Sequence, residues 1–222
     1  MNLSPIFISL KTASLSIVVT FFVGLMAARF VAGLRHAGAK MILDGLFTLP
    51  MVLPPTVAGF FLLIIFGNRG PVGRFFLEFF ALRIAFSWPA TVLAATVISF
   101  PLMYRAGRGA LEQVNPDLIH AARTLGMGEG AIFFKVSLPT ALPGIAAGAV
   151  LAFARGLGEF GATAMIAGNI AGKTRTLPLA IYSAVAAGDM ESAGSLVLII
   201  SLISFIVVAL INFLTRLEGK SP

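Results

Sequence analysis

The octapeptide AGNIAGKT, residues 167–174, carries glycine, lysine and threonine in the order that phosphate-binding loops use. The strict pattern G-x-x-x-x-G-K-[ST] has glycine where this chain has Ala167, although a looser form accepts alanine. Such a loop needs a buried strand that delivers backbone amides to the phosphate at a helix start. Here the preceding residues continue a glycine-rich apolar helix, and no apolar run ending in Asp-Glu follows to hold magnesium. We therefore interpret Lys173 and Arg175 as part of a solvated loop, and expect this chain itself to bind no cofactor.

Other chemistries lack the necessary side chains. There is no cysteine, and the two histidines, His36 and His120, both fall in predicted loops. A thiolate site, a disulfide and a histidine cluster are thereby excluded, and we expect no metal site. Of nine acidic residues only Glu159 lies far from the ends of a predicted span, so paired carboxylates for acid–base catalysis are missing as well. We expect the chain not to be an enzyme.

The composition indicates a membrane protein. The 222 residues are 58% hydrophobic and 11% charged, with a mean hydropathy of +0.99. That is more apolar side chain than a soluble core of this size can bury. The net charge of +7 is scattered between apolar segments and forms no single stripe, so it is typical of membrane-flanking residues and does not indicate nucleic-acid binding.

Uncharged intervals of about 20 residues, the length that crosses a bilayer, predict an all-α protein with about five transmembrane helices. We place these helices at residues 6–30, 41–66, 84–104, 142–167 and 194–215. The second contains Pro50, Pro54 and Pro55, which should kink or interrupt it. Between the last two spans we expect an outer loop that carries a short helix.

Charge at membrane depth is expensive, so an ionisable residue there is a functional candidate. Arg155 and Glu159 lie one helical turn apart and can pair. Two interpretations stay open: a structural ion pair that fixes the helix beside its glycines, or a gate in the translocation pathway. Pro54 and Pro55 join these two as candidate pathway residues, because interrupted helices can act as joints between inward-open and outward-open states.

The longest polar interval begins at Arg105 and ends at Lys135. It predicts a helix around 111–125 that breaks at Asn115 and Pro116, and a second helix around 129–136. A membrane subunit without a nucleotide site must take work from a partner, and a rigid helix-turn-helix can fill a partner's groove. We expect a sharp turn at Gly126, Arg123 at the rim of the contact, and four apolar side chains inside it: Leu125, Ile132, Phe133 and Phe134.

The segment HAARTLGMGEGAIFFKVSLP, residues 120–139, resembles the EAA loop of ABC-transporter permeases, whose usual form is E-A-A, three residues, G, nine residues and I-x-L-P. The matching positions are Ala121, Ala122, Gly126, Val136, Leu138 and Pro139, while His120 stands at the usual Glu position. The resemblance implies a cytoplasmic ATPase-coupling loop at about 105–137. Its expected contact residues are His120, Ala121, Ala122, Arg123, Leu125, Gly126, Phe133, Leu138 and Pro139.

Nearly the whole chain is similar to the molybdate branch of type I ABC permeases, through LPMVLPPTVAG, GNRGPVG, FSWPATVLAATVISF and GEFGATAMIAGN followed by KTRTLP. Sulfate permeases share GEFGA and AGNI, but TRTLPLAIY is more molybdate-like. The resemblance implies one transmembrane domain over 1–222 with the type I permease fold, in a bacterial or archaeal cytoplasmic membrane. It further implies a homodimer, two ATPase subunits that hold ATP and magnesium, and an extracytoplasmic molybdate-binding protein.

Three functions are therefore distinguished. The first is import of molybdate, or of tungstate as a similar dianion. The second is import of sulfate or thiosulfate. The third is a stand-alone anion channel or secondary transporter; secondary transporters usually carry coupling-ion sites in the membrane, and neither would explain the docking loop.

Overall fold

The computed structural model describes residues 3–34 and 36–218, and all regular structure in these ranges is helical. This confirms the all-α prediction. The helices are α1 (Ser4–Ala32), α2 (Ala37–Val52), α3 (Pro55–Phe66), α4 (Pro71–Phe80), α5 (Trp88–Glu112), α6 (Pro116–Thr124), α7 (Glu129–Ile132), a π-helical turn (Phe133–Ser137), α8 (Leu138–Leu157), α9 (Gly161–Ala167), α10 (Leu177–Ala186) and α11 (Met190–Glu218).

Four helical segments are long and apolar enough to cross a membrane: α1, α5, the continuous run from α7 through α8, and α11. A fifth span results if α2 and α3 count as one interrupted crossing, bent by 109°. The predicted number of spans is thus confirmed. The second span is broken rather than merely kinked, because Leu53 and Pro54 are extended and Pro55 restarts the helix as its first residue.

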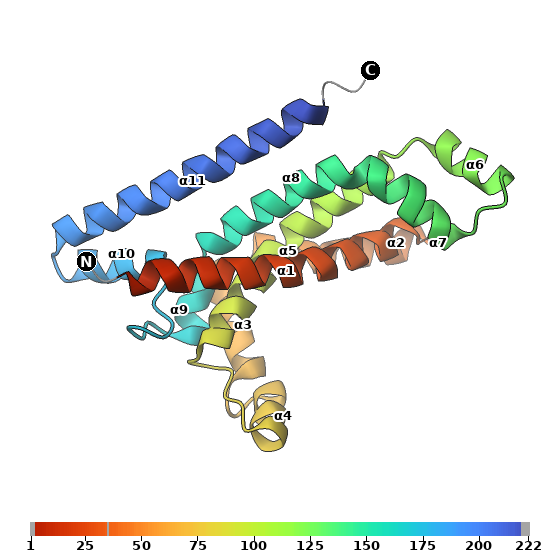
Figure 1. Ribbon diagram of the computed structural model, residues 1–222. Helices are drawn as coiled ribbons and strands as arrows, with labels where there is room; N and C mark the ends of the chain where they lie inside the picture. The colour runs from red at the N-terminus through yellow and green to blue at the C-terminus, as the bar shows by residue number, and fades with distance from the viewer. Residues whose placement is uncertain (1–2, 35, 219–222) are drawn as a thin grey trace.

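The helices α1 and α5 run side by side through the centre of the bundle, and α8 covers α5 on another side (Figure 1). Three hydroxyl pairs at one-turn intervals join α1 to α5: Thr12 with Thr91 at 2.9 Å, Ser16 with Thr96 at 3.3 Å, and Thr20 with Ser99 at 3.2 Å. Because both partners advance together along the chain, the two helices are parallel. Small and hydroxyl residues let the backbones approach closely, as in other membrane bundles.

The prediction ended the third span at Tyr104, but α5 continues to Glu112. Its last two turns are polar and are held by ion pairs with α2: Arg108 to Asp44 at 2.5 Å, and Lys40 to Glu112 at 2.7 Å. Both ion pairs join α5 to another helix, so they cannot be inferred from the sequence of this segment alone. Because they neutralise the charges of these two turns, the helix continues where a loop was expected.

The fourth span also differs from the prediction. A continuous helical run starts at Glu129 and ends at Leu157, and a separate short helix, α9, follows the break. The second half of the interrupted span, α3, packs on the short helix α9. Their contact is very close at Gly59, where an added Cβ would lie 2.6 Å from the Cα of Ala162.

Two connecting segments contain helices. The segment before α5 folds into α4, which exposes Phe75, Phe79 and Phe80. The connection between α9 and α11 contains the expected short helix, α10. Figure 1 places α6 and α7 at one end of the bundle, beside the end of α1 and the start of α2, whereas the start of α1 and α10 lie at the opposite end.

Candidate coupling and translocation site

The phosphate-loop pattern forms a closed turn. The backbone N–H groups of Lys173, Thr174 and Arg175 all donate to the carbonyl of Ile170, at 2.9–3.1 Å. The buried hydroxyl of Thr174 in turn accepts from the N–H of Ile170 at 3.0 Å. In a phosphate-binding loop these amides face the ligand instead. The amides of this turn are already used by the chain itself.

The interval between α5 and α8 is a helix-turn-helix, as predicted. The side chain of Asn115 accepts from the N–H of Asp117 at 2.9 Å and caps α6, and Pro116 takes the first helical position. At the other end Gly126 has a φ of +77°. Its N–H donates to the carbonyl of Arg123, while that of Met127 reaches the carbonyl of Ala122. This paired closure is a Schellman motif, which explains why a glycine stands there.

Contacts within the chain make this helix-turn-helix rigid. The guanidinium of Arg123 donates two hydrogen bonds to the carboxylate of Glu129, at 2.7 and 3.1 Å. That carboxylate raises the pKa of Arg123 further above its ordinary value, so the guanidinium stays charged at physiological pH. The guanidinium of Arg29, at the end of α1, lies 3.7 Å from the ring centre of Phe133, a cation–π contact. This contact connects the helix-turn-helix to α1.

The apolar side chains of this segment divide into two groups. Leu125 is 81% exposed and Phe134 is 67% exposed. Ile132 is only 2% exposed and Phe133 is half-buried. The expectation that all four fill a partner's pocket is therefore wrong for Ile132, because its side chain packs inside its own chain.

The remaining motif residues follow the same division. Ala122 is buried and Leu138 is half-buried, so they position the segment. The exposed positions are His120, Ala121, Arg123, Gly126 and Pro139. The residues before α6 were assigned to the coupling loop, but positions 105–112 belong to α5, and the exposed segment starts only after that helix ends.

Two of the four candidate pathway residues, Arg155 and Glu159, meet at the break before α9, and Pro55 lies next to the first residue of α9. Arg155 pairs with Glu159 at 2.8 Å, and Glu159 is only 2% exposed. The second carboxylate oxygen accepts from the N–H of Ala162 at 2.8 Å and caps α9. A Cβ on the neighbouring Gly161 would lie 3.0 Å from the Cβ of Pro55. Because both oxygens of Glu159 have partners in the chain, this geometry favours the structural interpretation of the pair.

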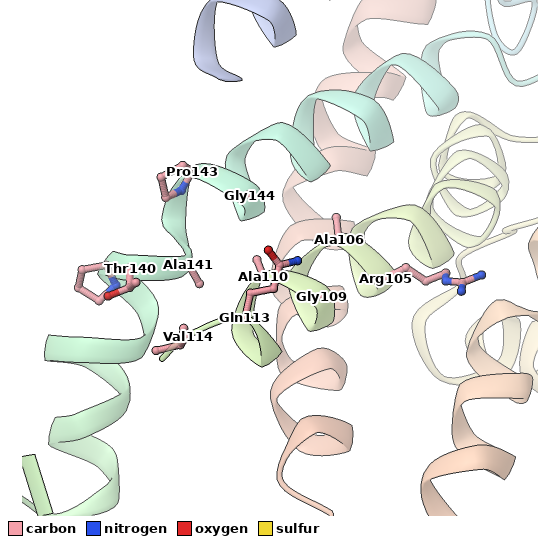
Figure 2. Close-up of a pocket in the computed structure, with 11 residues that line it drawn as sticks. Arg105, Ala106, Gly109, Ala110, Gln113, Val114, Thr140, Ala141, Pro143 and Gly144 are labelled. Atoms are coloured by element: carbon pink, nitrogen blue, oxygen red, sulfur yellow. The ribbon is translucent and has the colours of Figure 1, made fainter. Parts of the chain in front are cut away.

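A groove that the sequence interpretation missed lies between the last turns of α5 and the first turns of α8 (Figure 2). Its volume is about 780 Å³, and Arg105, Gly109 and Gln113 line it from α5, with Thr140 and Pro143 among the residues of α8. The three α5 residues are spaced by one helical turn, which was the available signal. It was overlooked because these positions were assigned to a loop.

Helical segments that form up to five apolar crossings, one of them interrupted, with a helix-turn-helix at one end of the bundle, are the architecture of a polytopic membrane protein. The chain belongs to the family described as binding-protein-dependent transport system inner membrane component, whose model matches residues 20–218. This family is a class of membrane transport subunits, and the predicted multi-pass membrane location is confirmed.

The similar curated proteins are transport permeases. The chain is 45% identical over 216 residues to the molybdenum transport system permease protein ModB of Escherichia coli (strain K12), covering 97% of this chain and 94% of that protein. It is 40% identical over 221 residues to the ModB of Haemophilus influenzae, covering 99% and 96%. A putative molybdenum transport system permease protein of Bacillus subtilis, YvgM, is 38% identical over 209 residues, with coverage of 94% and 92%.

Solved structures confirm the fold. An inward-facing structure of the MetNI methionine ABC transporter aligns with a TM-score of 0.68 at 21% identity, covering 95% of this chain and 94% of that chain. A bacterial ABC transporter that imports the acidic polysaccharide alginate aligns with a TM-score of 0.74 at 16% identity, covering 96% and 78%. The predicted type I permease fold is thus confirmed.

Proposed function

We propose that this chain is the permease subunit of an ATP-driven importer of molybdate, with tungstate as a second substrate of the same shape and charge. The observation that carries the proposal is the 45% identity, over 97% of the chain, to a molybdenum transport permease. Molybdate is a tetrahedral dianion, and a pathway for it should offer donors and mild positive potential without a site so tight that release stalls.

The helix-turn-helix is the proposed contact with a separate ATPase, on which ATP and magnesium reside. Leu125 and Phe134 are the exposed apolar side chains that suit a partner's pocket. The helical run from Glu129 to Leu157 is continuous, so a push on α7 moves α8 as one body. Ile132 and the Arg123–Glu129 pair hold the helix-turn-helix in one conformation. A movement of the ATPase would therefore displace α8 and would not deform the helix-turn-helix.

The proposed assembly is a homodimer in the bilayer with two ATPase subunits on the cytoplasmic side and a molybdate-binding protein outside. This orientation puts α6 and α7 in the cytoplasm and α10, with the turn that carries Lys173, outside. In support of further contacts, α2 has no buried residue, and α11 exposes Leu198, Leu202 and Phe205. Such faces suit lipid or a second copy of the chain.

The proposal is tested by purifying the tagged chain with the ATPase that it recovers from the source cells, and reconstituting both into vesicles with a molybdate-binding protein from the same cells. Molybdate-loaded binding protein should stimulate ATP hydrolysis and ATP-dependent molybdate uptake. Stimulation by sulfate alone would identify a sulfate permease. Uptake that needs neither ATP nor the ATPase would instead identify a channel.

A matched pair of variants tests the docking surface. Leu125→Glu should abolish recovery of the ATPase, because it places a charge in the apolar contact, while the thermal midpoint of the permease stays unchanged. Leu118→Glu, near the opposite end of α6, is the control, since Leu118 is also exposed, at 48%, but lies outside the expected contact set. Equal ATPase recovery by both variants would contradict the assignment.

A further inference from the structure

The end of α5 forms the floor of an open trough. On one side lies the groove against α8, and on the other a smaller cavity of about 210 Å³ lined by Asp44, Arg108 and Glu112. Both cavities share Arg105 and Gly109. An added Cβ on Gly109 would meet nothing within 4 Å, so this face of α5 is uncovered over the turn between the two cavities.

Arg105 differs from the other basic residues on the helices of the bundle. Within the part of the chain that the structure describes, it has no ion pair, hydrogen bond or ring contact, and its side chain is exposed. Every other basic residue on α1, α2, α5 and α8 has a partner: Lys11 with Trp88, Arg29 with Phe133, Lys40 with Glu112, Arg108 with Asp44 and Glu112, and Arg155 with Glu159.

The acidic groups beside Arg105 are already matched. Asp44 accepts from Arg108 and from the hydroxyl of Tyr104, and Glu112 accepts from Arg108 and Lys40. These contacts leave the charge of Arg105 uncompensated in the trough. Figure 2 shows its side chain extending away from α8, and Arg105 also lines the smaller cavity. An unmatched cation in an open cavity makes the local potential positive.

The trough offers chemistry suited to an oxyanion. A guanidinium presents several N–H donors in a plane that matches two oxygens of a tetrahedral dianion. Neither Gln113 nor Thr140 joins Arg105 in this contact: Gln113 lines the groove against α8, and the hydroxyl of Thr140 donates to the carbonyl of Val136 at 2.7 Å. A single exposed cation binds the anion weakly enough to release it.

We infer that Arg105 contacts the transported oxyanion at the coupling end of the pathway, after the anion has left the binding protein. This inference rests on the proposed function and names a residue that acts within it. Arg105 lies seven residues before the end of α5, about 10 Å from the helix end at 1.5 Å per residue. It therefore stands inside the mouth of the pathway, ahead of the ATPase contact.

One experiment measures the potential directly, without transport. The chain has no cysteine, so Gly109→Cys supplies a single thiol beside Arg105. An anionic and a cationic methanethiosulfonate reagent are compared on the reconstituted complex, with and without Arg105→Gln. Arg105→Gln should lower the ratio of anionic to cationic labelling rates by about threefold to tenfold. An unchanged ratio, or a thiol that neither reagent reaches, would overturn the inference.

A second experiment connects the site to transport. Arg105→Gln should reduce ATP-driven molybdate uptake by about tenfold, with ATPase recovery and thermal midpoint unchanged, and Arg105→Lys should restore a substantial part. Arg83→Gln, at an exposed position outside the spans, is the control and should transport normally. Wild-type uptake by Arg105→Gln would refute the role of Arg105 alone. If the wild-type complex transports no oxyanion, the proposed function itself fails, whereas the labelling result still stands.

Discussion

The guanidinium of Arg155 lies 2.8 Å from the carboxylate of Glu159, across the break that separates α8 from α9. Glu159 is buried and also caps α9 through the N–H of Ala162. The Glu159 side chain therefore has two roles: it neutralises the cation at the end of α8 and accepts a hydrogen bond from a backbone N–H at the start of α9. These two contacts fix the geometry of the break between α8 and α9.

Arg155→Ala should destabilise the permease by at least about 2 kcal/mol, because it leaves a buried carboxylate without its partner. The cost falls toward the lower end for such pairs, since the side chain of Arg155 is 35% exposed. The thermal midpoint in detergent measures the effect. We also expect weaker ATP-driven uptake in reconstituted vesicles.

Glu159→Gln separates the charge from the cap. The amide oxygen can still accept from Ala162, so this variant should lose less stability than Arg155→Ala. Combining Arg155→Ala with Glu159→Gln should recover part of the loss, because no unpaired charge then stays buried. A double variant as unstable as the sum of both changes would show that the pair is not energetically coupled.

Gly59 sets the distance between α3 and α9. Gly59→Ala should destabilise the fold strongly, because its new Cβ would lie 2.6 Å from the Cα of Ala162 and 2.9 Å from the carbonyl oxygen of that residue. Backbone atoms at that distance cannot move without separating the helices. Overpacking of this kind costs about 1–3 kcal/mol, which thermal unfolding in detergent measures.

Gly45 supplies the matched control for that change. It also lies within a helix, α2, but an added Cβ there meets nothing within 4 Å. Gly45→Ala should therefore be neutral or stabilising by up to about 1 kcal/mol, the helix propensity difference. If both variants lowered the midpoint equally, the close approach at Gly59 would not be the cause.

The sequence predicted correctly those features of the fold that depend on the backbone of single residues. Pro54 and Pro55 predicted the interrupted span, because proline restricts the backbone and lacks an N–H donor. Gly126 predicted the turn, because glycine accepts a positive φ. The extension of α5 was not foreseen, since it depends on Lys40 and Asp44 from another helix. The missed trough follows from the same error, because Arg105 could be placed on a helix face only once that helix was known to continue.

The turn at Gly126 is a further test of rigidity in the docking element. Gly126→Ala forces a Cβ into a left-handed conformation with a φ of +77°, which costs about 1–2 kcal/mol. The loosened turn should reduce ATPase-coupled uptake more than it lowers the thermal midpoint. Gly130→Ala, on α7 with open space around an added Cβ, should leave both unchanged. Equal losses in the two variants would indicate that any alteration of this segment is harmful.

The hydroxyl pairs between α1 and α5 should contribute differently to stability. The cost of removing a hydroxyl depends on whether its partner keeps another hydrogen bond. Thr20→Val leaves Ser99 still bonded to the carbonyl of Ala95 at 2.7 Å, so its cost should be near the average of about 0.6 kcal/mol for such membrane contacts. Thr12 accepts from the indole N–H of Trp88 at 3.1 Å. Thr12→Val strands that donor and should cost about 1–3 kcal/mol.

Fluorescence distinguishes the two variants independently of stability. Trp88 is the single tryptophan of the chain, so its emission reports directly on the loss of its hydrogen-bond acceptor. Thr12→Val should shift the emission maximum, whereas Thr20→Val, two helical turns away along α1, should leave it unchanged. Should both variants show the same spectrum and the same midpoint, the parallel helices would be held by close packing of their small residues, and the hydroxyl pairs would add nothing measurable to the fold.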